Sequence, residues 1–325
     1  MTAESACRPS PAEGGSCALL LAGPTAVGKS EVALVLAERL RGEIVSVDSM
    51  QVYRGMDIGT AKPSAAERAR IRHHLIDVAE LTTLFDAAQF VKLARIAVAD
   101  IQSRARLPIL CGGTGLYFKA LLEGIGEMPG ADPVLRAKLE REPIADLLAE
   151  LAEHDRVTFS RIDRRNPRRI IRAIEVIRLT GRPFSDQQAA WSGLSRPHTP
   201  TPGFFALTRS AGELHRRIEA RVDSMFRLGL VNETQQLLER GLAENRTASQ
   251  ALGYRQTIEH LRGLRQLPET IELVKIRTRQ YAKRQLTWFR RQLRPSWILV
   301  EPGSRADAIA EYIAHEFSSS LKRCP

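Results

Sequence analysis

The sequence of 325 residues has few cysteines and no long apolar run. Its four cysteines (Cys7, Cys17, Cys111 and Cys324) are scattered and form no CxxC pair, which argues against a disulfide framework or a zinc site. No run of about 18 apolar residues occurs, so we expect no membrane-spanning helix and no membrane partner. Residues 1–16 lack the basic flank and apolar stretch of a signal peptide, and we expect them to form a disordered lead-in. These absences predict a cytoplasmic protein with reduced thiols.

Acidic residues are fewer than basic ones: Lys and Arg outnumber Asp and Glu by 48 to 37. The excess is concentrated in two segments. Residues 156–182 hold nine arginines and two acids, and residues 275–294 hold eight basic residues and no acid. Clustered Lys and Arg are expected where a protein neutralises the phosphates of a nucleic acid. A solvated face without a partner is the alternative interpretation of such charge.

Short apolar runs alternate with amphipathic stretches in the first third of the chain. The spacing predicts strands within 17–23, 43–48, 74–78 and 107–115, and helices over 30–40 and 85–106. Strand–helix alternation of this kind indicates an α/β fold with a parallel sheet flanked by helices.

The pattern changes after a Gly/Pro-rich joint at 124–133. Residues 134–195 are predicted to be all helical, and a second joint rich in proline follows at 195–203. The pattern then returns to strands and helices: strands at 204–208 and 297–301, and helices near 211–240, 249–263, 268–293 and 305–321. We therefore predict a P-loop NTPase-like α/β core made of 17–125 and 203–325, interrupted by an all-helical insert at 126–202.

The segment Gly23–Ser30 (GPTAVGKS) matches the G-x-x-x-x-G-K-[S/T] loop of nucleotide- and ATP-binding proteins at every fixed position. It follows an apolar strand and precedes a helix, as the motif requires. Its backbone N–H groups and the helix N-terminus would surround a phosphate, Lys29 would add a cation, and the Ser30 hydroxyl would hold Mg²⁺. The motif predicts a site for a di- or triphosphate without telling which one.

Asp48 closes the strand at 43–48, and no other strand predicted in the first third of the chain ends in an acid. Strand ends of a parallel sheet lie at the edge where the phosphate loop binds its ligand. Asp48 is therefore predicted to lie near the transferred group, as a metal ligand or a general base. A helix-capping or turn role is the alternative.

The segment DSMQVYRGMDIGTAKP (48–63) resembles the bacterial tRNA dimethylallyltransferase family. Further similar segments appear in the family's order from about residue 18 to 300: HHLID (73–77), GGTGLYFKALLEG (112–124), NPRRIIRAIE (166–175), HRRIEARV (215–222), ALGYRQ (251–256) and TRQYAKRQLTWFR (278–290). Arg72 departs from the pattern, which has proline there. Cys324 is the sole cysteine near the C-terminus, so the zinc finger of eukaryotic relatives is not expected.

The resemblance implies transfer of a dimethylallyl group from dimethylallyl diphosphate to N6 of adenosine 37 in tRNAs that read codons beginning with U. It implies Mg²⁺ as cofactor and the tRNA anticodon stem-loop as partner, and we expect a monomer. Asp48 is implied as general base, with Lys29, Thr114 and Arg217 as further catalytic residues. The residues implied for the diphosphate are Gly23, Pro24, Thr25, Ala26, Val27, Gly28, Lys29, Ser30 and Arg221. Arg217 and Arg221 both resemble the family's arginines that approach the diphosphate, and the sequence does not tell which of them contacts it. The positions implied for tRNA are Asp48, Ser49, Met50, Gln51, Thr114, Arg136, Arg168, Arg169, Ile170, Ile171, Arg172, Gln250, Ala251, Leu252, Gly253, Tyr254 and Arg255.

Three other functions use similar features. An adenylate isopentenyltransferase uses the same donor on free AMP or ADP, but it needs neither the basic segments nor the helical insert. A P-loop small-molecule kinase would use ATP and a set of lid arginines, and an RNA-binding P-loop protein would use nucleotide as a switch. Trp288 and Phe289 could stack on bases, but their helical spacing favours burial in the core.

Overall fold

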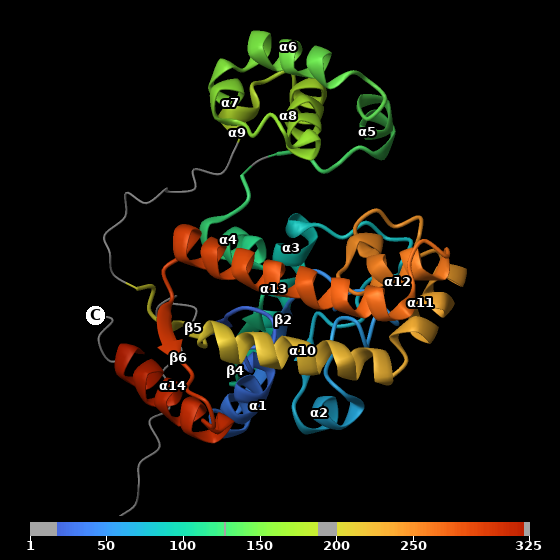
Figure 1. The fold of residues 1–325 in the computed structure, drawn as a ribbon. Coiled ribbons are helices and arrows are strands. Elements are labelled where there is room, and N and C mark those ends of the chain that lie inside the picture. Colours follow the sequence, from blue (N-terminus) through green and yellow to red (C-terminus); the bar gives the residue numbers. More distant parts are fainter. Residues whose placement is uncertain (1–17, 127, 188–199, 322–325) are drawn as a thin grey trace, which may run out of the picture.

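The computed structural model describes residues 18–126, 128–187 and 200–321. Its centre is a parallel sheet of six strands in the order β3-β2-β4-β1-β5-β6, with helices on both faces (Figure 1). The strands are β1 (Leu19–Ala22), β2 (Gly42–Val47), β3 (His73–His74), β4 (Leu107–Gly112), β5 (Phe204–Thr208) and β6 (Ser296–Leu299). The predicted α/β fold with a parallel sheet is confirmed.

The central strands are apolar at nearly every position because both faces of the sheet are covered. Leu19 and Leu21 of β1 pack on one face with helices α1, α10 and α14, whereas Leu20 and Ala22 pack on the other with α3, α4, α11 and α12. The helices of this core are α1 (Lys29–Arg39), α2 (Ala65–Arg70), α3 (Ala87–Ser103), α4 (Gly115–Glu123), α10 (Ala211–Arg227), α11 (Leu230–Glu239), the 3₁₀ turn η1 (Ala248–Gln250), α12 (Tyr254–Leu261), α13 (Leu267–Gln292) and α14 (Ala306–Leu321).

A separate bundle of short helices lies beyond α4 (Figure 1). Its members are α5 (Pro133–Leu139), α6 (Ile144–His154), α7 (Arg156–Arg161), α8 (Pro167–Thr180) and α9 (Phe184–Gln187). They enclose an apolar core of their own, to which α6 and α8 contribute most. Helix α8 has clear end signals: the Asn166 side chain accepts from the Arg169 N–H at the start, Pro167 opens the first turn, and Gly181 ends the helix at φ 66°.

Three elements differ from those that the periodicity predicts. The strand expected over 74–78 is reduced to β3, because Leu75 and Asp77 take positive φ values of 62° and 56°, which no strand accommodates. The helix expected over 211–240 is two helices, because Gly229 at φ 100° breaks it. Helix α2 was not predicted, since it buries no side chain and shows no apolar period.

The lead-in at 1–16 and residues 188–199 of the insert and its joint lie outside the described residues. In the part of the chain that is described, no helix is both long and apolar enough to span a membrane.

Candidate active site

A cavity of about 710 Å³ opens at the edge of the sheet where β1, β2 and β4 end. Segments far apart in the chain form its walls: the phosphate loop, the residues after β2, the turn at 59–61, and parts of α10, α12 and α13. The charged residues among its walls are Lys29, Asp48, Arg221, Arg255, Glu259, Arg265, Arg277 and Arg284. Cations therefore dominate a space large enough for a small organic ligand.

The phosphate loop takes its curled shape from two glycines. Gly23 has φ 148°, and a Cβ there would lie 2.8 Å from the Leu207 carbonyl oxygen. Gly28 has φ 105° and immediately precedes α1, whose first residue is Lys29. The loop thus leads straight into a helix N-terminus, where backbone N–H groups attract an anion. The loop residues that line the cavity are Thr25, Lys29 and Ser30.

Lys29 is half-buried and forms no ion pair with a carboxylate among the described residues. Its Nζ donates a hydrogen bond to the Pro24 carbonyl oxygen at 2.8 Å. The pKa of Lys29 is lowered to about 8, mainly by loss of solvent and also by the nearby Arg221, although Cys111 and Asp48 act to raise it. A lysine with a lowered pKa and no counterion is stabilised by an incoming anion.

Arg221 of α10 is the second such cation. One of its guanidinium nitrogens donates to the Thr60 carbonyl oxygen at 3.4 Å, and no described carboxylate forms an ion pair with it. Burial lowers the pKa of Arg221, against the raising effect of Asp48 and alongside the lowering effect of Arg217. Two half-buried cations in one cavity, neither ion-paired with a described carboxylate, indicate a ligand carrying more than one negative charge.

Asp48 stands directly after β2 and faces the same cavity. Its Oδ1 accepts the backbone N–H groups of Met50 at 2.8 Å and Gln51 at 3.3 Å. Within the described chain, Oδ2 has no hydrogen-bond partner, so one carboxylate oxygen is held in place by the turn while the other is available to a ligand. The neighbouring Ser49 N–H donates to Thr114 Oγ1 at 3.1 Å, which joins this turn to the start of α4.

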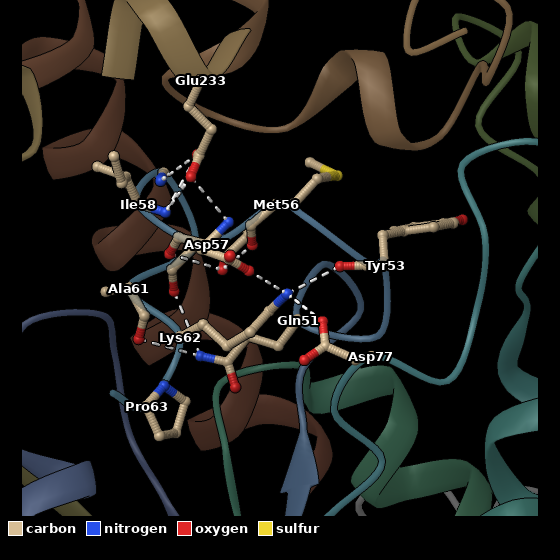
Figure 2. A network of polar contacts seen from close by, with 12 residues as sticks. Gln51, Tyr53, Met56, Asp57, Ile58, Ala61, Lys62, Pro63, Asp77 and Glu233 are labelled. Atoms are coloured by element: carbon tan, nitrogen blue, oxygen red, sulfur yellow. Dashed lines mark hydrogen bonds and ion pairs between the residues drawn. The ribbon is translucent and has the colours of Figure 1, made fainter. Parts of the chain in front are cut away.

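The wall at 57–62 is held by a dense polar network (Figure 2). The Glu233 carboxylate accepts N–H groups from three consecutive residues, the shortest from Ile58 at 2.9 Å, and the Tyr254 hydroxyl at 2.6 Å. The Lys62 side chain, 1% exposed, pairs with Asp57 and Asp77 at 2.6 Å each. Much of the DSMQVYRGMDIGTAKP segment thus takes part in this network, and its polar residues hold the wall in shape.

The cavity face of α13 was missed by sequence reasoning, although the basic segment 275–294 was noted. Arg277, Thr278, Tyr281, Arg284 and Gln285 recur at helical spacing and line the cavity. The three- and four-residue spacing of these polar side chains could have indicated that they share one face of the helix. Trp288 and Phe289 point elsewhere and pack in the core, which confirms the prediction for these aromatics.

The phosphate-site residues expected from sequence are not all in the cavity. Arg217 lies behind the phosphate loop, where its Nε donates to the Ala26 carbonyl oxygen at 2.8 Å, whereas Arg221 lines the cavity. Gly23, Pro24, Ala26, Val27 and Gly28 shape the loop without lining the cavity. Thr114 does not line it either, and acts through its contact with Ser49. Arg217 therefore contacts the phosphate loop directly, whereas Arg221 contacts the Thr60 carbonyl oxygen and faces the cavity.

The residues expected to contact tRNA are also divided. Ser49, Met50, Gln51, Gln250, Ala251, Leu252 and Arg255 line the cavity. Ile170, Ile171 and Tyr254 have buried side chains that pack in the cores, so they support the surface from beneath; Gly253 caps α12 at φ 89°.

The arginines of the insert fall into two groups. Arg168 and Arg169 are exposed, with no ion pair to a described residue. Arg136 and Arg172 instead bind the fully buried Glu175 at 2.5 and 2.8 Å.

Fold and site together define a P-loop-type α/β protein with a cationic cavity in which the Asp48 carboxylate stands beside Lys29 and Arg221. The family model for IPP transferases matches residues 51–292. A tRNA dimethylallyltransferase of Pelotomaculum thermopropionicum is 43% identical over 91% of this chain and 95% of its own length, and one of Halorhodospira halophila is 50% identical over 84% and 90%.

Two solved structures agree. A tRNA isopentenylpyrophosphate transferase of Bacillus halodurans aligns with a TM-score of 0.68 and 37% identity, covering 95% of this chain and 99% of its own. A eukaryotic dimethylallyltransferase acting on tRNA aligns with a TM-score of 0.76 and 26% identity, covering 94% and 79%. The chain belongs to the IPP transferase family.

Proposed function

We propose that this protein transfers a dimethylallyl group from dimethylallyl diphosphate to N6 of adenosine 37, beside the anticodon of tRNAs that read codons beginning with U. The observation that carries the proposal is the shared cavity of Lys29, Arg221 and Asp48: two half-buried cations without an ion-pair partner among the described residues, beside a carboxylate with one free oxygen. A diphosphate supplies the missing negative charge, and the carboxylate serves the acceptor.

In the proposed reaction the diphosphate lies in the phosphate loop, bonded by the backbone N–H groups, Lys29 and Arg221. The bond between the allylic carbon and the diphosphate oxygen breaks, and its electron pair leaves on the diphosphate. The adenine N6 lone pair forms the new bond to that carbon. Asp48 accepts the N6 proton, which the amine loses as it becomes acidic. The Lys29 and Arg221 cations, partly shielded from solvent, stabilise the charge that develops on the leaving group.

The residues also fit the Mg²⁺ that the resemblance implies. The described residues include no cluster of three or more His, Cys, Asp or Glu that could hold a metal alone. Mg²⁺ does not need one, because it keeps several waters and binds through one or two protein oxygens and substrate phosphates. The Ser30 hydroxyl, which lines the cavity, would hold it, and when bound it would neutralise charge on the leaving diphosphate.

The acceptor adenine must leave its stacked position beside the anticodon to reach the cavity. Arg168 and Arg169 on the outer face of α8 would bind tRNA phosphates while the base is inside. Free AMP would not need this surface, so the helical bundle favours tRNA over a mononucleotide acceptor. A monomeric state and a cytoplasmic location stay predictions.

Incubation with radiolabelled dimethylallyl diphosphate separates the candidates. With bulk tRNA we expect label in adenosine next to the anticodon, and with AMP or ADP we expect none. ATP should not be consumed in either reaction. Label on AMP alone would favour an adenylate transferase, and ATP turnover in step with the reaction would favour a kinase or a nucleotide switch.

A further inference from the structure

One side chain of α13 bridges two loops of the cavity. Gln285 is 8% exposed and lines the cavity. Its Oε1 accepts the backbone N–H of Thr25 in the phosphate loop at 2.9 Å, and its Nε2 donates to the Gly113 carbonyl oxygen after β4, also at 2.9 Å. One amide thereby satisfies a donor and an acceptor from loops that follow two adjacent strands.

The approach of α13 to this edge depends on two glycines. A Cβ on Gly113 would lie 2.5 Å from Gln285 Nε2, and a Cβ on Gly115 would lie 2.1 Å from the Trp288 ring. Both distances are shorter than real Cβ contacts, so a side chain at either position would displace the Gln285 amide or the Trp288 ring. Gln285 and Trp288 are three residues apart and lie on the same side of the helix. The glycines of the GGTG turn therefore pack directly against α13, within the segment TRQYAKRQLTWFR.

This contact continues to the general base. Gly113 is followed by Thr114, whose Oγ1 accepts the Ser49 N–H at 3.1 Å, and Ser49 is the neighbour of Asp48. A covalent and hydrogen-bonded path thus runs from the phosphate loop through Gln285 to the turn that carries Asp48. The two loops hold the two reacting partners of the proposed transfer.

We propose that Gln285 is a positioning residue that locks the phosphate loop to the Thr114 turn and so fixes the donor diphosphate relative to Asp48. The expected kinetic effects of Gln285 rest on the proposed function, whereas its expected effect on diphosphate binding does not. A glutamine is required because the position needs a donor and an acceptor at the same reach. Glutamate keeps the acceptor and lacks the donor, and methionine keeps the length and lacks both.

Gln285→Met leaves the Thr25 N–H and the Gly113 carbonyl without their partner. A buried polar group left unpaired is costly, so the loop should shift towards water or another acceptor. We expect the dissociation constant of inorganic pyrophosphate and the KM for dimethylallyl diphosphate each to rise about tenfold, equivalent to about 1.4 kcal/mol. The kcat should fall at least tenfold as well, because the donor diphosphate and Asp48 are no longer held in a fixed position relative to each other. The affinity for tRNA should stay within twofold.

Isothermal titration with inorganic pyrophosphate and Mg²⁺, steady-state kinetics at saturating tRNA, tRNA titration and thermal melting test the proposal together. The matched control is Gln236→Met, the same change at an exposed position of α11, which should behave as wild type. A merely structural role would lower the melting temperature and the active fraction, and so kcat, while leaving the donor KM unchanged. That outcome, or wild-type pyrophosphate binding by Gln285→Met, overturns the proposal.

If Gln285→Met does not fold, Gln285→Asn decides. Its amide keeps the donor, the acceptor and the zero charge but is one methylene shorter and cannot reach both loops, so weaker pyrophosphate binding supports the proposal and unchanged binding refutes it. If the wild-type protein transfers no prenyl group to tRNA, the proposed function fails, and the pyrophosphate titration still tests Gln285.

Discussion

The outer face of α8 offers a direct test of RNA binding by the helical bundle. Arg168 and Arg169 are exposed and form no ion pair with a described residue. Arg172, one turn on, binds Glu175 at 2.8 Å and donates to the Pro129 carbonyl oxygen at 2.6 Å. Reversing Arg172 would place a carboxylate beside a buried one and would test folding as much as RNA binding. The informative variant is therefore Arg168→Glu with Arg169→Glu.

The size of the effect follows from the number of phosphates that this face contacts. Binding that releases counterions falls with salt, and the log–log slope changes by about 0.7 for each phosphate contacted on a single strand. Two free guanidinium groups predict a slope that is flatter by about 1.4 in the double variant. The affinity for tRNA should fall at every salt concentration, because two repulsive charges replace two attractive ones. Affinity for dimethylallyl diphosphate should not change, since the insert has its own core apart from the cavity.

Titration of labelled tRNA at four or more salt concentrations measures both quantities. The control is Arg39→Glu with Arg305→Glu, which makes the same change in net charge on α1 and beside α14, on the side of the molecule away from the insert (Figure 1). The control should keep the wild-type slope. An unchanged slope in the α8 variant, or equal flattening in both, would refute a role of this helix in holding tRNA.

Three further predictions concern the cavity. Asp48→Asn keeps the Oδ1 acceptor for the Met50 N–H and removes the base, so single-turnover rates should drop by about 10²–10⁴ with tRNA affinity intact; a loss below tenfold would contradict the assignment. Because the pKa of Lys29 is lowered to about 8 and its protonated form binds the diphosphate, the donor KM should rise as pH increases above about 8. Lys29→Arg, which stays charged, should remove that rise, and its persistence would rule out Lys29 as the cause. Gly115→Ala should destabilise the fold by about 1–3 kcal/mol in chemical denaturation because its Cβ meets Trp288. Trp288→Leu in the same chain should recover part of that loss; strictly additive effects would show that the two sites do not touch.

Local sequence determined much of this molecule. The phosphate loop, its place between β1 and α1, and the glycines that curl it follow from eight consecutive residues, because backbone geometry there depends on near neighbours. The central strands were predictable from continuous apolar runs. Helix α8 was predictable from its amphipathic period, and its ends at Asn166 and Gly181 obey local capping rules. The place of Asp48 also followed, since it needs only a strand end and a parallel sheet.

Tertiary structure decided which side chains share the cavity. Arg217 and Arg221 lie one helical turn apart on the same face of α10, and their sequence context is alike. Only Arg221 lines the cavity, because the position of α10 along the sheet places Arg217 against the phosphate loop instead. Gln285 joins residues 260 and 172 positions away, and no local pattern indicates such partners. Glu175 likewise forms internal ion pairs with Arg172 of the basic segment 156–182 and with Arg136 of α5. Periodicity tells which face of a helix is apolar, but the partner of a polar side chain depends on how distant segments pack, and that is fixed only when the whole core forms.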